Sequence, residues 1–272
     1  MNRNHQSAGA QVESDPLAEE RRFGGIARLY GQAALERFFR SRVCVIGIGG
    51  VGSWAAEALA RSGIGALTLI DLDHVVESNV NRQLPALDGQ FGKAKIDVMG
   101  ERVRAIHPRC QIHLIDDFLT EDNLDRLIPP EYDFVIDCVD SFRVKAALIA
   151  HCRRQKSRVI TVGGAGGQID PLQIRIADLS RSVHDPLLAK TRRLLRRQYH
   201  FPRNLKRRFD VPCVYSTEQP RFPTEDGGVC VGRTEAAAVS GLNCGGFGSA
   251  MPVTASFGLA AVAYLLARLA AA

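Results

Sequence analysis

The sequence predicts an α/β protein built on a doubly wound, largely parallel sheet. Short apolar runs, of the kind buried on both faces of a parallel sheet, alternate with segments of helical periodicity over residues 42–164. The first run ends in a glycine ladder, Gly47, Gly49 and Gly52, which leads directly into a helical segment. Strands and helices that alternate in this way fold with right-handed crossovers, so the expected architecture is Rossmann-like.

The elements up to residue 164 follow from their local pattern. Residues 16–40 have helical character, and Gly63 and Pro108 are expected to end two later helices. Strands are predicted at 42–49, 66–73, 111–118, 132–140 and 157–164, and helices at 53–63, 93–108, 123–128 and 141–155.

The remainder of the chain is less regular. Residues 173–180 are expected to add a further strand, with an antiparallel orientation as one option. Residues 184–228 are polar, basic and punctuated by prolines, which predicts an irregular segment. Residues 245–269 return to a core-like pattern. The apolar run 255–272 is interrupted by Arg268, which favours a buried or amphipathic C-terminal helix over membrane contact.

Composition and the ends of the chain indicate one folded domain. Residues 1–20 lack the apolar core of a secretory signal and predict a disordered polar tail, followed by a single domain over 21–272. The formal net charge of +6 favours an anionic partner. None of the seven cysteines forms a Cys-x-x-Cys pair, which argues against a zinc ribbon and fits reduced thiols in a cytoplasmic protein.

The glycine ladder predicts a nucleotide site. In such a ladder the first glycine permits a tight turn, the second lets the backbone approach a phosphate or sugar, and the third packs helix against strand. Gly50 belongs to the same loop, and Asp71 ends the second predicted strand, where an acid commonly binds a ribose hydroxyl. These features do not distinguish NAD from ATP.

Charged side chains further along the chain favour a triphosphate. A triphosphate carries more charge than the pyrophosphate of NAD and typically needs cationic side chains and a metal ion. Asp140, at the end of the fourth predicted strand, is the carboxylate expected to hold Mg²⁺. The alternative is a set of solvated surface charges. The other predicted ATP-binding residues of these loops are Asp73, Asn79, Asn81, Arg82, Gln83, Lys95 and Ser141.

The motifs "VCVIGIGGVG", "SNVNRQ", "GKAK" and "DCVDS" together resemble the ubiquitin-activating-enzyme-like adenylyltransferases. That family consists of homodimers that use ATP to adenylate a carboxylate. The resemblance implies that the glycine loop and Asp71 hold the adenosine, that Asn81 and Arg82 hold phosphates, that Lys95 reaches the β/γ end and that Asp140 binds Mg²⁺. It therefore implies catalytic roles for Arg82, Lys95 and Asp140.

Two features of that family are missing from this chain. Relatives that activate ubiquitin-like proteins commonly carry two Cys-x-x-Cys pairs for zinc, and this sequence has none. The family also has an N-terminal Arg-aromatic-x-Arg motif whose second arginine enters the partner subunit's ATP site. Here Gly25 stands in that position, which leaves Arg22 or Arg28 as a substitute.

Further motifs, "RRFGGIARLYG", "DPLLAKTR" and "GFGSAMPVTASFG", resemble a tRNA-modifying branch of the family. This resemblance implies adenylation of a carboxylate on a modified adenosine beside the anticodon, ring closure with loss of water, and association with a cysteine desulfurase system. Residues 190–208 independently favour RNA, because nine Lys or Arg and no acid are interleaved with Tyr199, His200 and Phe201. The predicted tRNA-binding residues are Arg192, Arg193, Arg196, Arg197, Lys206, Arg207 and Arg208.

Other interpretations remain at this point. The chain could activate a small ubiquitin-like sulfur carrier, or it could be an NAD oxidoreductase or a nucleotide-binding adaptor. The basic run 190–208 could be an ordinary solvated helix face. Cys244 is the first candidate for a reactive thiol, against a purely structural role. The glycine-rich loop 162–171 is expected to line the substrate crevice, with a monovalent-cation site as the alternative.

Overall fold

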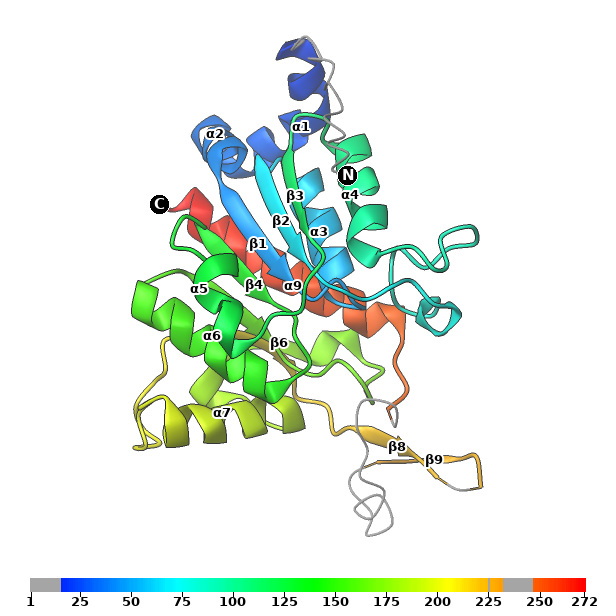
Figure 1. Cartoon of the computed structure of the whole chain (residues 1–272), viewed down its shortest axis with the longest axis vertical. Coiled ribbons are helices and arrows are strands. Elements are labelled where there is room, and N and C mark those ends of the chain that lie inside the picture. Colours follow the sequence, from blue (N-terminus) through cyan, green and yellow to red (C-terminus); the bar gives the residue numbers. More distant parts are fainter. Residues whose placement is uncertain (1–15, 225, 232–246) are drawn as a thin grey trace, which may run out of the picture.

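The computed structural model describes residues 16–224, 226–231 and 247–272. A seven-stranded sheet runs through the molecule in the order β3-β2-β1-β4-β5-β7-β6 (Figure 1). Every neighbouring pair is parallel except β7 and β6, which are antiparallel. The predicted sheet is therefore confirmed. Its strands are β1 (Arg42–Ile46), β2 (Ala66–Ile70), β3 (Gln111–Ile115), β4 (Phe134–Asp137), β5 (Val159–Val162), β6 (Ile174–Asp178) and β7 (Pro212–Ser216).

Helices cover both faces of the sheet, with α9 crossing behind the strands in Figure 1 and α5 and α6 in front of them. The two layers follow from the period-two alternation of buried strand residues. Val43 and Val45 of β1 face one hydrophobic core, and Cys44 and Ile46 face the other. The first core is closed by α2 (Gln32–Arg40), α3 (Gly52–Arg61), α4 (Lys95–Ile106) and α9 (Met251–Ala270), and the second by α5 (Leu124–Leu127), α6 (Phe142–Gln155) and α7 (Pro186–Gln198).

Short elements complete the described chain. Four 3₁₀ turns shape the loops at η1 (Glu77–Asn79), η2 (Glu121–Asn123), η3 (Pro171–Gln173) and η4 (Leu179–Arg181). Strands β8 (Arg221–Pro223) and β9 (Val229–Val231) pair antiparallel in a small second sheet that projects from the main body in Figure 1.

The N-terminal helical segment differs from its prediction in two details. Helix α1 (Pro16–Tyr30) begins four residues before the predicted tail ends at residue 20. The helical stretch predicted over 16–40 is also divided, because Gly31 has a φ of 92° between α1 and α2. A positive φ of this size is unfavourable for residues with a Cβ, so a glycine marks the break.

The prediction of an irregular segment over 184–228 was wrong where α7 and β7 form. Asp185 caps α7, Pro186 occupies its first turn, and Leu188 and Leu195 bury its apolar face. Strand β7 lies inside the sheet between β5 and β6, so Cys213 is a buried strand residue. High charge concealed the amphipathic pattern of α7. The partners of β7 lie 34–52 residues earlier in the chain, beyond the reach of local pattern.

Helix α9 agrees with the predicted buried C-terminal helix. Within the described ranges it is the single helix long and apolar enough to cross a membrane by length and composition. Its side chains Phe257, Val262 and Leu265 are buried in the first core. Its apolar character is therefore accounted for by packing against the sheet.

Candidate nucleotide and RNA sites

The loop after β1 brings two of its glycines against neighbouring backbone. Gly47 has a φ of 85°, and a Cβ on it would lie 2.9 Å from the carbonyl oxygen of Cys138. A Cβ on Gly52 would lie 1.9 Å from the carbonyl oxygen of Gly47. The environment of Gly49 is open, with the nearest neighbouring atom at 4.0 Å. Gly47 and Gly52 therefore shape the loop, and Gly49 leaves space beside it.

Asp71 joins this loop to the end of β2. Its carboxylate accepts hydrogen bonds from the amide of Ile48, in the glycine loop, and from the amide of Asp73 at 2.8 Å. Burial raises the pKa of Asp71, while the two amide hydrogen bonds act in the opposite direction. Asp71 lies where the sequence placed it, at the carboxyl edge of the sheet beside the glycine loop.

Lys95 and Asp73, two of the predicted ATP-binding residues, form an ion pair. The Lys95 Nζ lies 2.7 Å from Asp73 Oδ2, and 5% of the lysine residue is exposed. Lys95 opens α4, and its backbone amide donates to the Asp73 carbonyl at 3.0 Å. These contacts hold the ammonium group at the same sheet edge as Asp71, paired with the more exposed Asp73 carboxylate.

The loop around η1 connects the site to the start of α9. The Asn81 side-chain amide donates to the carbonyl of Ser249 at 2.6 Å, and the Met251 amide donates to the Asn81 carbonyl at 3.1 Å. The buried Asn79 accepts a hydrogen bond from Val76, so this predicted ATP ligand shapes the loop itself. Ser249 was not foreseen, because it lies 168 residues from Asn81.

Arg82 and Gln83 pack directly on the glycine loop. A Cβ on Gly50 would lie 3.2 Å from Arg82 Cγ, and the Arg82 guanidinium donates to the Ser78 carbonyl and the Asn81 side chain at 2.7 and 2.8 Å. Gln83 is buried beside Gly49, and its Oε1 has no hydrogen-bond partner among the described residues. An unpaired buried acceptor is costly, and an amino or hydroxyl group of a nucleotide would satisfy it.

Asp140 and Ser141 follow β4 at the same edge. The Cys138 amide donates to the Ile46 carbonyl at 2.9 Å, which fixes this loop against the glycine loop. Asp140 is exposed, and Ser141 is the N-cap residue of α6. The described residues contain no group of three or more His, Cys, Asp or Glu that could hold a metal. One carboxylate nevertheless fits Mg²⁺ bound to a nucleotide, because phosphates and waters supply the other ligands.

A fully buried polar cluster beneath this edge was missed by sequence reasoning. Lys145 Nζ lies 2.9 Å from Asp137 Oδ2, and the Thr161 hydroxyl donates to the same oxygen at 2.6 Å. The other Asp137 oxygen accepts the Val139 amide at 3.1 Å, which holds the loop that carries Asp140. The one available indication was a lysine in the otherwise apolar stretch of α6, four residues after Ser141.

The glycine-rich loop 162–171 is held by neighbouring elements. The Glu218 carboxylate accepts the amides of Ile169 and Asp170 at 3.0 and 2.9 Å. The Gly167 carbonyl accepts the Arg221 amide at 2.7 Å, and the Gly164 carbonyl accepts the Gln168 side chain at 3.1 Å. With the carbonyls of Asp170 and Pro171, which accept the Gln173 and Ile174 amides, at least four carbonyls of the loop are used within the protein, so a monovalent cation there stays a prediction.

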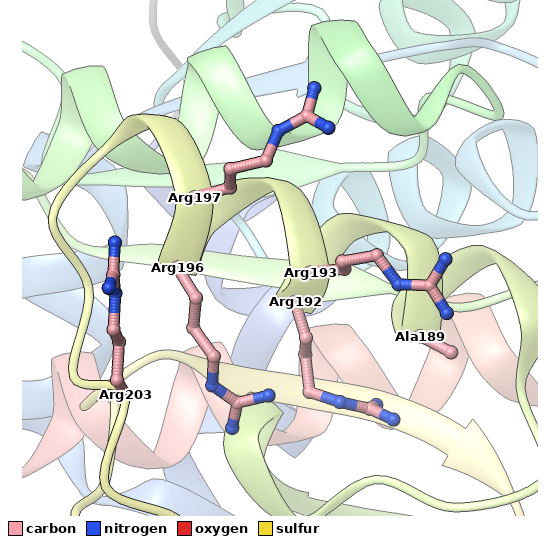
Figure 2. Close-up of a pocket in the computed structure, with 6 residues that line it drawn as sticks. All are labelled: Ala189, Arg192, Arg193, Arg196, Arg197 and Arg203. Carbon is pink, nitrogen blue, oxygen red and sulfur yellow. The ribbon is translucent and has the colours of Figure 1, made fainter.

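Helix α7 carries four of the seven predicted tRNA-binding residues. With Arg203 they line a surface depression of about 500 Å³, and Figure 2 shows their guanidinium groups fanning out along the helix. Arg192 and Arg196 are half-buried: the first donates to the Ser182 hydroxyl, and the second lies 5.0 Å from the centre of a phenylalanine ring. Arg193 and Arg197 are exposed. The helix therefore presents a cationic face.

The loop after α7 contains the other three, Lys206, Arg207 and Arg208, all exposed. The interleaved aromatic residues differ from expectation. Phe201 packs on Phe209 with ring centres 5.0 Å apart, and the Tyr199 hydroxyl donates to Glu121 at 3.1 Å. Because these contacts occupy both half-buried side chains, the interpretation of Tyr199 and Phe201 as base-stacking platforms is not supported.

The remaining sequence candidates are a thiol and an arginine. Cys244 lies outside the described residues. Burial raises the pKa of Cys213 to about 12, which leaves little thiolate at neutral pH. The Arg22 guanidinium donates to the Ile106 carbonyl at 2.9 Å, so it is bound to its own chain, and Arg28 lies in the last turn of α1.

The family model for the ThiF family matches residues 24–269, which include the glycine loop, Arg82, Lys95 and Asp140. The chain belongs to the ThiF family. It is 51% identical over 251 residues to the tRNA threonylcarbamoyladenosine dehydratase of Haemophilus influenzae, covering 92% of this chain and 94% of that protein. It is 51% identical over 253 residues to the Escherichia coli enzyme of the same name, covering 93% and 94%.

The fold agrees with that of a solved family member over almost the whole chain. The E. coli dehydratase TcdA in complex with ATP matches with a TM-score of 0.83 and 48% identity, over 96% of this chain and 97% of that one. The ThiF-family fold of this protein is thus the fold of an enzyme crystallised with ATP.

Proposed function

We propose that this protein is an ATP-dependent tRNA threonylcarbamoyladenosine dehydratase. The observation that carries the proposal is the set of charged residues at the carboxyl ends of β1, β2 and β4. Arg82 packs on Gly50 of the glycine loop, Lys95 pairs with Asp73 after β2, and Asp140 follows β4, the strand next to β1. This arrangement suits a triphosphate, because it combines backbone amides with two cations and a carboxylate. The similarity to dehydratases over more than nine-tenths of the chain supports the tRNA substrate.

The reaction proceeds in two steps. A carboxylate oxygen of the threonylcarbamoyl group attacks the α-phosphorus of ATP, which forms an acyl-adenylate and expels pyrophosphate. A nitrogen or oxygen of the same side chain then attacks the activated carbonyl carbon, loses its proton and expels AMP. The substrate becomes cyclic and loses one water overall. Because the second attack is intramolecular, the effective concentration of the nucleophile is high and an enzyme thiol is not needed.

The residues of the site divide the work of the first step. Gly47, Gly49, Gly50 and Gly52 and the start of α3 hold the nucleotide, and Asp71 binds its ribose. Arg82 and Asn81 bind phosphates, and Lys95 leaves Asp73 to neutralise the pyrophosphate as charge develops on it. Asp140 would hold Mg²⁺, which would supply positive charge to the phosphates. Gln83 and Ser141 complete the nucleotide pocket, and Asn79 shapes the loop that carries Arg82.

The partners follow from the same proposal. The exposed basic residues of α7 and the following loop bind the tRNA backbone through phosphate contacts. The protein acts as a homodimer and works with a cysteine desulfurase system in the cytoplasm. Of the two candidate arginines, Arg28 is the one that reaches the neighbouring subunit, because Arg22 is bound to Ile106 of its own chain. Helix α9 is a core helix in this arrangement and does not contact a membrane.

The proposal is tested with tRNA that carries the threonylcarbamoyl group. Purified protein, ATP and Mg²⁺ should release AMP in step with tRNA conversion, and the modified nucleoside should become about 18 Da lighter, the mass of one water. Unmodified tRNA is the matched control and should give no AMP. AMP release that depends on a ubiquitin-like protein and not on modified tRNA would refute the proposal.

A further inference from the structure

Asp185 connects the arginine-bearing helix to the edge of the sheet that holds the nucleotide site. It is the N-cap residue of α7, and 4% of the residue is exposed. Its Oδ1 accepts the Leu188 amide at 2.8 Å, within the first turn of α7. Its Oδ2 accepts the Gly164 amide at 2.9 Å, in the loop after β5. One carboxylate therefore holds both elements.

The contact with the loop is closely packed. A Cβ on Gly163 would lie 1.8 Å from Asp185 Oδ2 and 3.1 Å from Leu188 Cδ1. The Gly163 amide is itself fixed, since it donates to the Val214 carbonyl of β7 at 2.9 Å. The loop therefore packs against the first turn of α7 in one fixed arrangement, which requires a glycine at position 163.

A helix cap does not by itself require this arrangement. Capping takes one acceptor oxygen, and a serine supplies it as well as an aspartate. Here the second oxygen is also removed from solvent, and burial raises the pKa of Asp185 even though two amides donate to it. The buried Lys145 ammonium, paired with Asp137, is the cation that acts on it. The Gly164 amide of the loop and the positive charge of Lys145, in the cluster beneath Asp140, thus offset the cost of burying the carboxylate.

We propose that Asp185 is a positioning residue that fixes α7 against the Gly163–Gly167 loop. When the arginines of α7 hold the tRNA, this fixed position directs the carboxylate of its threonylcarbamoyl group toward the bound ATP. The inference rests on the proposed function. Its physical basis is orientation, because a misplacement of about 1 Å between reacting groups can lower a rate about 100-fold. Asp185 acts through the two elements that it joins and does not contact the reacting atoms.

Asp185→Ser separates this role from the helix cap. A serine retains an acceptor for the Leu188 amide but is too short to reach Gly164. We expect the melting temperature to stay within a few degrees of wild type, and the dissociation constants for ATP and modified tRNA to stay within twofold. The single-turnover rate of AMP release should fall at least tenfold. Asp185→Asn, which retains the side-chain volume and one acceptor oxygen, should show the same loss of rate.

Asp178→Ser is the matched control. Asp178 is also a buried capping aspartate, and it accepts the Ser180 and Phe209 amides at 3.0 Å, but it lies at the opposite end of the sheet. This variant should lower the melting temperature without slowing AMP release per folded molecule at saturating modified tRNA. Saturation is required because Asp178 also lies 3.7 Å from the Arg208 guanidinium, one of the predicted tRNA-binding groups. Equal slowing in the Asp178 and Asp185 variants, or wild-type rates in both Asp185 variants, would overturn the inference. A failure of the proposed function would show differently, as absence of AMP release by the wild-type protein.

Discussion

Gly52 and Gly49 stand three residues apart in one loop, and the structure predicts opposite outcomes for replacing them with alanine. In Gly52→Ala the new methyl group would lie 1.9 Å from the Gly47 carbonyl oxygen, whereas real contacts of this kind are not shorter than 3.0 Å. The first turn of α3 must then separate from the loop by about 1 Å. Backbone, and not a flexible side chain, has to move.

The expected loss of stability in Gly52→Ala follows from the cost of overpacking. Inserted methyl groups in packed regions cost about 1–3 kcal/mol, and a displaced backbone places Gly52→Ala at the upper end, about 3 kcal/mol. At about 2–4 °C per kcal/mol for a domain of this size, the melting temperature should fall by about 6–12 °C. In Gly49→Ala the nearest neighbouring atom is 4.0 Å away, so the melting temperature should stay within about 2 °C.

Thermal melting followed by circular dichroism measures the stability of each variant, and isothermal titration calorimetry with ATP measures its nucleotide affinity. Gly52→Ala should lose both stability and ATP binding, because the loop is displaced. Gly49→Ala should lose only ATP binding, because its methyl group occupies the space that we propose for the nucleotide. A Gly52→Ala protein that melts within 2 °C of wild type would refute the reasoning from close approach. ATP affinity equal to wild type in Gly49→Ala would show that the nucleotide does not bind beside this loop.

Three further predictions follow from the charged residues. Lys95→Ala should lower AMP release at least 100-fold with an unchanged circular dichroism spectrum, and Lys95→Arg should restore part of it; near-normal turnover in Lys95→Ala would exclude its phosphate role. Burial acts to raise the pKa of Glu57, but hydrogen bonds from two arginines outweigh it and lower the pKa in the folded state, so its stabilising effect is present above pH 4.5 and is lost as the pH falls. The difference in melting temperature between wild type and Glu57→Gln should therefore shrink between pH 6 and pH 3, and a difference that grows on acidification would contradict the sign. Reversing Arg193 and Arg197 to Glu should weaken tRNA binding and reduce its salt slope by about one unit per lost phosphate contact, whereas Arg104→Glu, on the opposite face of the sheet, should not. If the double variant binds tRNA as the wild type does at every salt concentration, the arginines of α7 are solvated surface charges and do not contact tRNA.

Local sequence pattern determined most of the sheet and the centre of the site. The strands before residue 164 are short apolar runs whose character is set by adjacent residues, and each was recognised without knowledge of its neighbours. Gly47, Gly52 and Asp71 were likewise found from spacing, because the strand–turn–helix unit that they shape is contiguous in the chain. Arg82 and Lys95 were singled out as cations in the loop after the second strand, and their roles in binding phosphates stay predictions.

Only the tertiary structure decided which distant groups meet. Strand β7 lies inside the sheet because β5 and β6 pair with it, and no local signal in a basic, proline-containing segment states that pairing. Asn81 reaches Ser249 across 168 residues, and Asp185 reaches Gly164 from the next helix. The periodicity of a sequence indicates which residues of a single helix or strand are buried. The partner of a buried polar group depends on how the elements pack, so such contacts become visible only in the folded chain.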